Sequence, residues 1–377
     1  MARKLRTDLS DELGVEYPIF LAGMNSGGQG QLRSPTPVKL VAAITNAGGV
    51  GVLGDSFLSL DELDQGIKET RKLVGDKPFG VDFMLPASLE EVGAKSNRDV
   101  YREIERDYPQ NVAFVDQLIK DFNLPDVEVP ERKPMSIDMI KSKLELVFDN
   151  NVPIFAAALG DPAIMTERAH NQGMKVIGMA GAVRHAARHV AADVDIIAAQ
   201  GTEAGGHTGS ISTMVLVPQV VDAVAPRPVL AAGGIGSGRQ VAAALALGAQ
   251  GAWVGTAFLV AEEGNSADTH KEQILGGSSE QFTLSKYGSG KQQRAFHNAI
   301  RDAWSKSNLG ILPMPLQGIL RERLNEAIKR SERDDLSEIP SGQIGGMLTK
   351  QRPAKDIFMD LVNGAEETIE QIQSNLG

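Results

Sequence analysis

Short runs of apolar residues alternate with longer amphipathic segments over most of the chain. The runs are rich in Val, Ile, Leu and Ala and lead into glycine or polar turns, which is typical of buried parallel strands. The predicted strands are 18–22, 49–54, 79–85, 153–158, 175–178, 194–199, 228–232 and 251–254. The predicted helices between them are 37–46, 60–73, 136–150, 161–172, 182–192, 214–223 and 237–247. Eight strands at this spacing favour a (β/α)8 TIM barrel, because an open doubly wound sheet usually stops at five or six strands.

Two long segments interrupt this alternation. Residues 86–134 are charged and proline-containing, so we interpret them as an insertion on a βα loop, partly helical over 94–120. Residues 265–342 are charged and irregular, and we predict a small, mostly helical cap domain over the barrel mouth. Residues 343–377 then return to the barrel and end in a helix over 354–374, which leaves residues 1–264 as the barrel proper.

Composition removes several classes of function. The 377 residues are 42% hydrophobic and 23% charged, as in ordinary soluble proteins, and the net charge of -10 argues against a nucleic-acid partner. Without cysteine the chain has no disulfide, thiolate metal site or cysteine nucleophile. No apolar run reaches the ~18 residues of a membrane span, and no secretory h-region follows the N-terminus. We therefore expect a cytoplasmic protein without a membrane or nucleic-acid partner.

Residues 200–209 combine a glycine-rich loop with two ionisable side chains at the end of a predicted strand. Glycine lets the backbone approach a ligand closely, but a plain turn needs neither Glu203 nor His207. We predict that Glu203 accepts hydrogen bonds from loop N–H groups and that His207 faces a substrate. The alternative for His207 is a core histidine held by a backbone carbonyl.

Two further loops have the composition of a phosphate cradle. Gly233 and Gly234 lead into a helix, and Gly255 and Thr256 follow the next strand. In many barrels the loops after strands 7 and 8 and a helix N-terminus bind one phosphate through their N–H groups. The spacing fits FMN or a sugar phosphate and does not match a dinucleotide fingerprint.

These motifs resemble one protein family. The stretches QGTEAGGHTG at 200–209, AAGGIG at 231–236 and GAQGAWVGT at 248–256 are similar to the nitronate monooxygenase family, formerly called 2-nitropropane dioxygenases. Flavin-dependent enoyl-acyl-carrier-protein reductases and some NADH:quinone reductases share them. The resemblance covers 18–256 and resumes at 342, whereas the insertion at 86–134 matches much less well.

The resemblance implies an FMN-binding barrel in which His207 is the active-site histidine and no metal takes part. Its implied cofactor-binding residues are Ala22, Gly23, Met24, Asp82, Gln200, Gly205, Gly206, Gly233, Gly234, Gly255 and Thr256. Two positions depart from the family pattern. Asp82 replaces an asparagine expected at the pyrimidine edge of the flavin, and Met179 replaces a lysine of some members. An ionised Asp82 would disfavour the anionic reduced flavin.

The leading hypothesis is FMN-dependent oxidation of alkyl nitronates, or of nitroalkanes, by O2 to a carbonyl compound and nitrite. The first alternative is a flavin-dependent NAD(P)H reductase acting on an enoyl thioester or a quinone. Gly27 and Gly28 would be its only spare nucleotide-binding turn. The second alternative is a phosphate-binding barrel without redox chemistry. A homodimer is compatible with any of these.

Other features carry weaker signals. His185 and His189 have a metal-like spacing, but no third ligand is near, so we predict a solvated helix face. The segment 286–291 resembles a phosphate loop but lacks the Walker spacing. Residues 294–297 are interpreted as cap core rather than substrate contacts, and Gln343 either closes the site or belongs to a turn.

Overall fold

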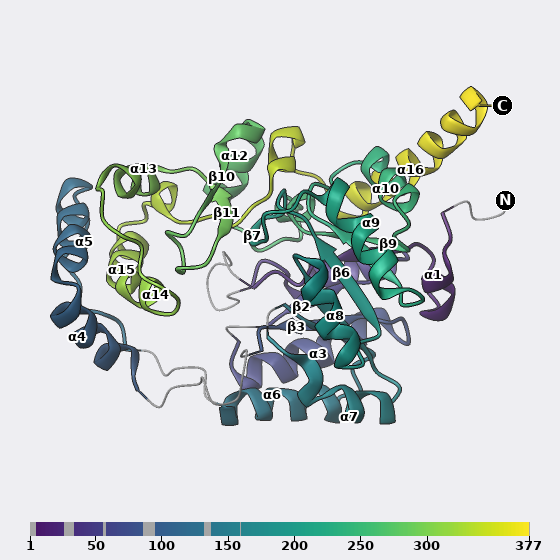
Figure 1. Ribbon diagram of the computed structural model, residues 1–377, viewed down its shortest axis with the longest axis horizontal. Coiled ribbons are helices and arrows are strands. Elements are labelled where there is room, and N and C mark those ends of the chain that lie inside the picture. The colour runs from purple at the N-terminus through teal and green to yellow at the C-terminus, as the bar shows by residue number, and fades with distance from the viewer. Residues whose placement is uncertain are drawn as a thin grey trace.

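The computed structural model describes residues 5–25, 34–55, 58–85, 95–131, 137–158 and 160–376, and its largest feature is a barrel of parallel strands (Figure 1). The barrel strands are β1 (Ile19–Leu21), β2 (Val52–Gly54), β3 (Gly80–Phe83), β4 (Ile154–Ala157), β5 (Lys175–Ala180), β6 (Ile196–Gln200), β8 (Val229–Ala232) and β9 (Gly251–Val254). Their order is β1-β9-β8-β6-β5-β4-β3-β2, and a parallel bridge between Phe20 and Val50 joins the two ends. Each overlaps one of the eight predicted runs, so the (β/α)8 barrel is confirmed.

Helices surround the sheet, and their caps explain where they begin. They are α2 (Val38–Asn46), α3 (Leu60–Val74), α6 (Ile137–Asp149), α7 (Thr166–Asn171), α8 (Val183–Ala191), α9 (Thr213–Val224), α10 (Gly238–Ala246) and α16 (Ala354–Leu376). Before α3, the Ser59 hydroxyl accepts the Glu62 N–H at 3.2 Å and the Glu62 carboxylate accepts the Ser59 N–H at 2.7 Å. This capping box fixes the helix start, and Leu63 and Ile67 then face the sheet.

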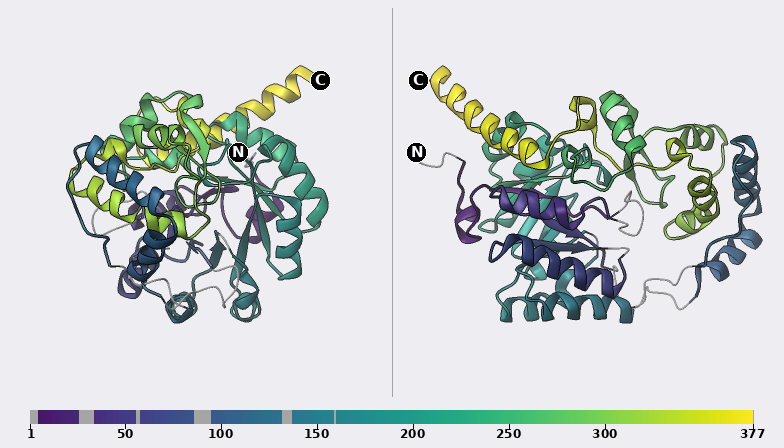
Figure 2. Two further views of the ribbon diagram at one scale, coloured as in Figure 1. Left: turned by 60° about the vertical axis from the view of Figure 1, so that its left-hand side comes forward. Right: turned by 180° about the vertical axis from the view of Figure 1, so that it is seen from behind.

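The barrel interior and its outer layer form separate apolar clusters. Alternate strand residues, among them Phe20, Ile177 and Leu230, fill the interior, where the N-terminal Leu9 joins them. Leu9 belongs to α1 (Asp8–Glu12), a short helix that the sequence did not predict. The long α16 packs against α10 and α2 and completes the helix ring before its last turns project from the barrel (Figures 1 and 2).

One predicted helix is wrong in form. The single helix expected over 161–172 is a 3-10 turn, Pro162–Ile164, followed by the short α7. The Asp161 carboxylate accepts the Ala163 N–H at 3.0 Å and fixes the tight turn, which breaks the helical register.

A cap lies beside the barrel mouth and is built from two segments far apart in the chain (Figure 2). The first contributes α4 (Asn97–Asp107) and α5 (Pro109–Asp121). The second contributes α12 (Asp268–Gly276), the hairpin β10 (Phe282–Ser285) and β11 (Gln293–Phe296), α13 (Ala299–Lys306), α14 (Leu316–Leu320) and α15 (Glu322–Arg330). The cap is mostly helical, but the β10–β11 hairpin was not expected. The exact domain boundaries stay a prediction.

The two cap segments share one hydrophobic core, which we call the cap core. It includes Ile104, Val115 and Leu118 from the first segment and Trp304 and Leu324 from the second. Polar contacts seal the same junction. The Arg323 guanidinium donates to the Val127 carbonyl at 2.8 Å and to the Asp126 carboxylate at 2.6 Å. The insertion is therefore part of the cap.

Candidate active site

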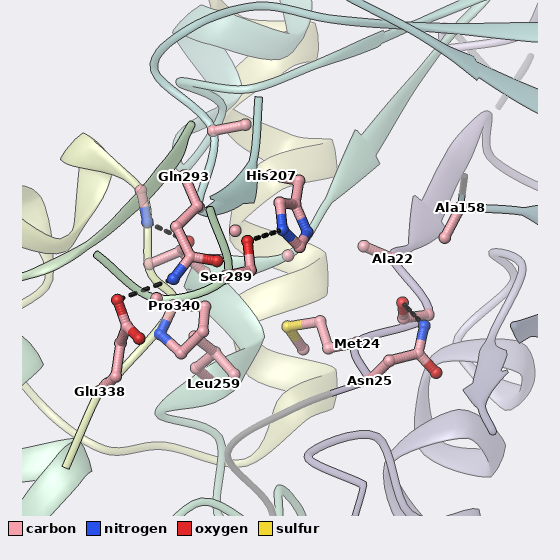
Figure 3. A pocket seen from close by; sticks show the side chains of 18 of the residues that line it. Ala22, Met24, Asn25, Ala158, His207, Leu259, Ser289, Gln293, Glu338 and Pro340 are labelled. Carbon is pink, nitrogen blue, oxygen red and sulfur yellow. Dashed lines mark hydrogen bonds between the residues drawn. The ribbon is translucent and has the colours of Figure 1, made fainter. Parts of the chain in front are cut away.

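A cavity of about 1320 Å³ lies between the barrel mouth and the cap. Its wall includes every residue that the sequence assigned to catalysis or to the cofactor: Ala22, Gly23, Met24, Asp82, Gln200, Gly205, Gly206, His207, Gly233, Gly234, Gly255 and Thr256. Figure 3 shows Ala22, Met24, Asn25 and Ala158 on one side of it and His207, Ser289, Gln293 and Glu338 on the other. The fold thus brings these positions into one space.

The loop after β8 needs glycine for its conformation. Gly233 and Gly234 have φ values of 91° and 72°, in the left-handed region that side chains rarely adopt. A Cβ atom on Gly233 would also lie 2.9 Å from the Gly201 carbonyl oxygen. Both glycines line the cavity, and they do so with backbone atoms alone.

Glu203 holds this loop to its neighbour. Its Oε2 accepts the N–H of Thr213, the first residue of α9, at 2.9 Å, and the Thr213 hydroxyl lies 2.9 Å from both this oxygen and the Gly233 carbonyl. Glu203 is thus a structural hydrogen-bond acceptor as predicted, although the N–H that it accepts belongs to the start of α9 and not to a loop.

The segment that returns from the cap to the barrel is hydrogen-bonded to the predicted phosphate-binding loops and to the loop of Glu203. The Gly342 N–H donates to the Thr256 hydroxyl at 2.8 Å, and the Gln343 N–H donates to the Glu203 carbonyl at 3.0 Å. Gln343 begins a 3-10 turn and lines a separate, smaller cavity of about 310 Å³. Of its two alternatives, the structure supports the turn.

His207 joins the barrel loop to the cap. With Gly206 it forms β7 (Gly206–His207), which pairs antiparallel with β11 so that His207 lies opposite Gln293. The imidazole Nε2 lies 2.7 Å from the Ser289 hydroxyl (Figure 3), and the Gln200 amide donates to the His207 carbonyl at 2.6 Å. The His207 imidazole is therefore hydrogen-bonded to a side chain. The alternative, a core histidine held by a backbone carbonyl, is wrong.

The surroundings of His207 favour the neutral imidazole. Burial lowers the pKa of His207 below its usual value, and the Lys291 ammonium lowers it further, while the Glu338 carboxylate opposes both. A neutral imidazole donates a hydrogen bond from one ring nitrogen and accepts one at the other, so it can orient a polar group or take up a proton.

The cap wall of the cavity is a polar network that the sequence did not reveal. The Gln293 amide donates to one oxygen of Glu338 at 2.7 Å, and the Arg321 guanidinium donates to the other at 2.6 Å. Arg321 also stacks over the Tyr287 ring at 3.9 Å. Ser289 lies in the turn between β10 and β11, within the segment 286–291 noted above, so that segment is a hairpin turn.

Two buried carboxyl groups lie at neighbouring strand ends below the cavity, and one of them, Asp82, lines it. Asp82 belongs to β3 and is 2% exposed. Gly23 packs directly against it, because a Cβ atom on Gly23 would lie 2.2 Å from the Cβ of Asp82, so only glycine fits at position 23. Asp55, at the end of the neighbouring strand, is fully buried, with its Oδ2 3.1 Å from the Lys143 ammonium. Burial raises the pKa of Asp55 to about 7 despite the attraction of Lys143.

Two weaker predictions have opposite outcomes. Arg294 is buried within the cap as expected and donates to the Thr202 carbonyl at 2.9 Å, although His297 of the same segment is exposed. The solvated face predicted for His189 is wrong: the ring is 7% exposed and its Nε2 lies 2.9 Å from the Met179 carbonyl. The buried ring is accommodated because β5 has a glycine at position 178, where a Cβ atom would lie 2.7 Å from the His189 imidazole.

Comparison with known proteins identifies the family. A sequence model described as nitronate monooxygenase matches residues 6–364. The chain belongs to the nitronate monooxygenase family. A Mycobacterium tuberculosis protein named as a monooxygenase, Rv1533, is 37% identical, with 98% of this chain and 99% of the relative covered. A Staphylococcus aureus protein named "Probable nitronate monooxygenase" is 30% identical, with 94% and 96% covered.

Solved structures share the architecture. A nitroalkane oxidase from Streptomyces ansochromogenes superposes with a TM-score of 0.77 at 27% identity, covering 97% of this chain and 99% of the other. FabK from Thermotoga maritima superposes with a TM-score of 0.74 at 26% identity, covering 99% and 100%. The family match and these neighbours together indicate that the protein is a flavin-dependent oxidoreductase of the nitronate monooxygenase type. No helix among the described residues is long and apolar enough to cross a membrane.

The site fits a flavin nucleotide. The bare backbone at Gly233 and Gly234 suits a phosphate, since a side chain at either position would be strained. Thr256 adds a hydroxyl group after the next strand. The oxygen of this hydroxyl accepts the Gly342 N–H, which leaves the hydroxyl proton for donation to a ligand. Small side chains at Ala22 and Ala158 leave the floor open for a flat ring system. The cavity is also larger than the ~300–1,000 Å³ usual for a single ligand.

Proposed function

We propose that this protein binds FMN and oxidises alkyl nitronates with O2, giving a carbonyl compound and nitrite. The observation that carries the proposal is the position of His207, which lines the same cavity as the glycine cradle. In the balanced reaction, two nitronate ions and one O2 give two carbonyl compounds and two nitrite ions. Cytoplasmic location and a homodimeric assembly are part of the proposal and rest on sequence alone.

The chain's own residues would position the reactants. Gly233, Gly234, Gly255 and Thr256 would hold the phosphate of the cofactor, whose ring system supplies the electron transfer from the nitronate. A nitronate already carries its negative charge, so it needs no base. His207 would orient the nitro oxygens, or accept the Cα proton when a neutral nitroalkane enters.

A second function is supported by the outer part of the cavity. Beyond His207 the wall carries Arg321, Asn325 and Lys329, and this polar extension exceeds what a small nitronate needs. A flavin-dependent reductase that takes an extended, polar donor such as NAD(P)H would use that space. We favour the nitronate, because Arg321 is already committed to Glu338 and Tyr287.

The experiment that separates the two is anaerobic reduction of the purified flavoprotein. Flavin released by heat should first be identified as FMN by chromatography. An alkyl nitronate should then bleach the visible flavin band within seconds, whereas millimolar NADH or NADPH should leave it nearly unchanged. Recovery of FAD, or of no flavin, would reject the cofactor assignment. Rapid bleaching by NADH with no response to nitronate would make the protein a reductase.

A further inference from the structure

Asp82 lies at the floor of the cavity in surroundings that do not suit a charge. It belongs to β3, lines the cavity and is 2% exposed. The Asn25 amide approaches its Oδ1 at 3.5 Å, the outer limit of a hydrogen bond. An ionised carboxylate that leaves water without a cation or several short hydrogen bonds loses much of its solvation energy.

The charges around Asp82 are unbalanced. Asp55 is its neighbour across the β2–β3 pair, and the Asp55 N–H donates to the Asp82 carbonyl at 2.8 Å. Lys143 on α6 is bound to Asp55, with its ammonium 3.1 Å from the carboxylate and 3.0 Å from the carbonyl oxygen. Glu62 on α3 adds a further negative charge that acts on Asp55. The Lys143 ammonium is therefore paired with Asp55, and Asp82 is not part of that ion pair.

The pKa of Asp82 reflects this lack of a nearby positive charge in the part of the chain that the structure describes. Burial is the largest and raises the pKa of Asp82 well above its usual value, and the Asp55 carboxylate raises it as well. The Asn25 amide and the Ala158 N–H act in the opposite direction but do not compensate. Among the described residues, no cation contributes to the pKa of Asp82.

We propose that Asp82 is protonated at neutral pH and donates a hydrogen bond from its carboxyl O–H to the group bound on the cavity floor. This step rests on the proposed function in one respect, namely that the acceptor is an oxygen or nitrogen of the flavin ring. A neutral acid supplies the donor that an amide would supply at this position. It also leaves the site free of a negative charge that would oppose reduction of a nearby flavin.

Infrared difference spectroscopy tests the protonation directly and needs no bound flavin. The spectrum of the wild type minus that of Asp82→Asn, both at pH 7, should contain the C=O stretching band of a protonated carboxylic acid. Asn has the same shape and is neutral, so we expect the variant to fold with an unchanged thermal midpoint. A difference spectrum that instead contains only carboxylate bands would overturn the proposal.

The reduction potential of the flavin tests the consequence. Replacing a neutral acid by a neutral amide should leave the potential nearly unchanged, whereas removing an ionised carboxylate would raise it clearly. Asp82→Leu removes the donor and should weaken flavin binding about 10-fold, the scale of one lost hydrogen bond. Equal flavin affinity in the Leu and Asn variants would overturn the donor role. If no flavin binds at all, the proposed function fails, while the infrared result still decides the state of Asp82.

Discussion

The barrel side and the cap side of the cavity are built in different ways. The barrel side consists of loops at strand ends, where glycines such as Gly233 and Gly255 expose backbone. The cap side consists of side chains that hold one another, as Glu338 does with Gln293 and Arg321. Backbone fixed by a strand end is positioned by the sheet itself, whereas the cap network depends on the cap core behind it.

His207 belongs to both sides. Its chain position is in the loop after β6, but its backbone pairs with β11 and its imidazole meets Ser289 in the cap hairpin. The proposed reacting group is thus held by the cap, while the proposed cofactor loops follow strands of the barrel. Loosening the cap should therefore affect turnover before it affects flavin binding, and the predictions below test this separation.

The largest expected effect is the loss of cap stability caused by a cavity-creating substitution in the cap core. Leu324→Ala removes a fully buried side chain from α15 and should destabilise the cap by about 2–5 kcal/mol. We expect faster proteolysis within 95–131 and 287–336, with flavin retained. Limited proteolysis with mass spectrometry, together with flavin absorbance, measures both.

The matched control is Leu40→Ala, which removes an equally buried leucine from α2 in the barrel layer. That variant should lose flavin together with stability. If the two variants released flavin to the same extent, the cap and the barrel would unfold as one unit and the separation would be wrong.

The second effect concerns His207 itself. His207→Asn keeps a polar side chain at the β7–β11 junction but removes the imidazole, so turnover should fall by roughly 10²-fold or more. Flavin content and thermal midpoint should stay as in the wild type. Ser289→Ala, which removes only the hydroxyl 2.7 Å from Nε2, should cost much less. Joint loss of flavin and stability in His207→Asn would show that the histidine serves the fold.

The difference between the two sides also explains what the sequence could reveal. Strand ends and glycine loops are local patterns, so the barrel and the positions of Gly233, Gly255 and Thr256 could be predicted residue by residue. Asp82 was likewise predicted at the site and lines the cavity, but the pairing of Lys143 with the neighbouring Asp55 is a long-range contact that the sequence does not indicate.

The cap could not be predicted in the same detail, because its contacts are long-range. Ser289 lies 82 residues from His207 in the chain, and no periodicity relates them. The strands β10 and β11 have four residues each, too few for alternation to stand out. Helix was expected over part of 94–120 and over most of 265–342, but nothing in the sequence indicated that α5 and α15 pack on each other.

The smallest effect should come from Lys291, an exposed residue at the end of the cap turn. Its ammonium lowers the pKa of His207, although less than burial does. Activity that needs the neutral imidazole therefore persists as the pH falls through the usual histidine range. Lys291→Gln should raise the pKa of His207 and move the acid limb of the pH profile toward higher pH, with little change in turnover on its plateau.

This shift is a charge effect, so it has two internal controls. Lys286→Gln removes the same charge from the other end of the turn and, since Lys286 does not contribute to the pKa of His207, should leave the acid limb in place. High salt should bring the wild-type and Lys291→Gln profiles together, because ~1 M salt shortens the screening length to about 3 Å. A shift in the opposite direction, or one that survives high salt, would mean that Lys291 acts through the shape of the turn that presents Ser289. In that case the cap side would control His207 by position alone, and burial would be the remaining cause of its low pKa.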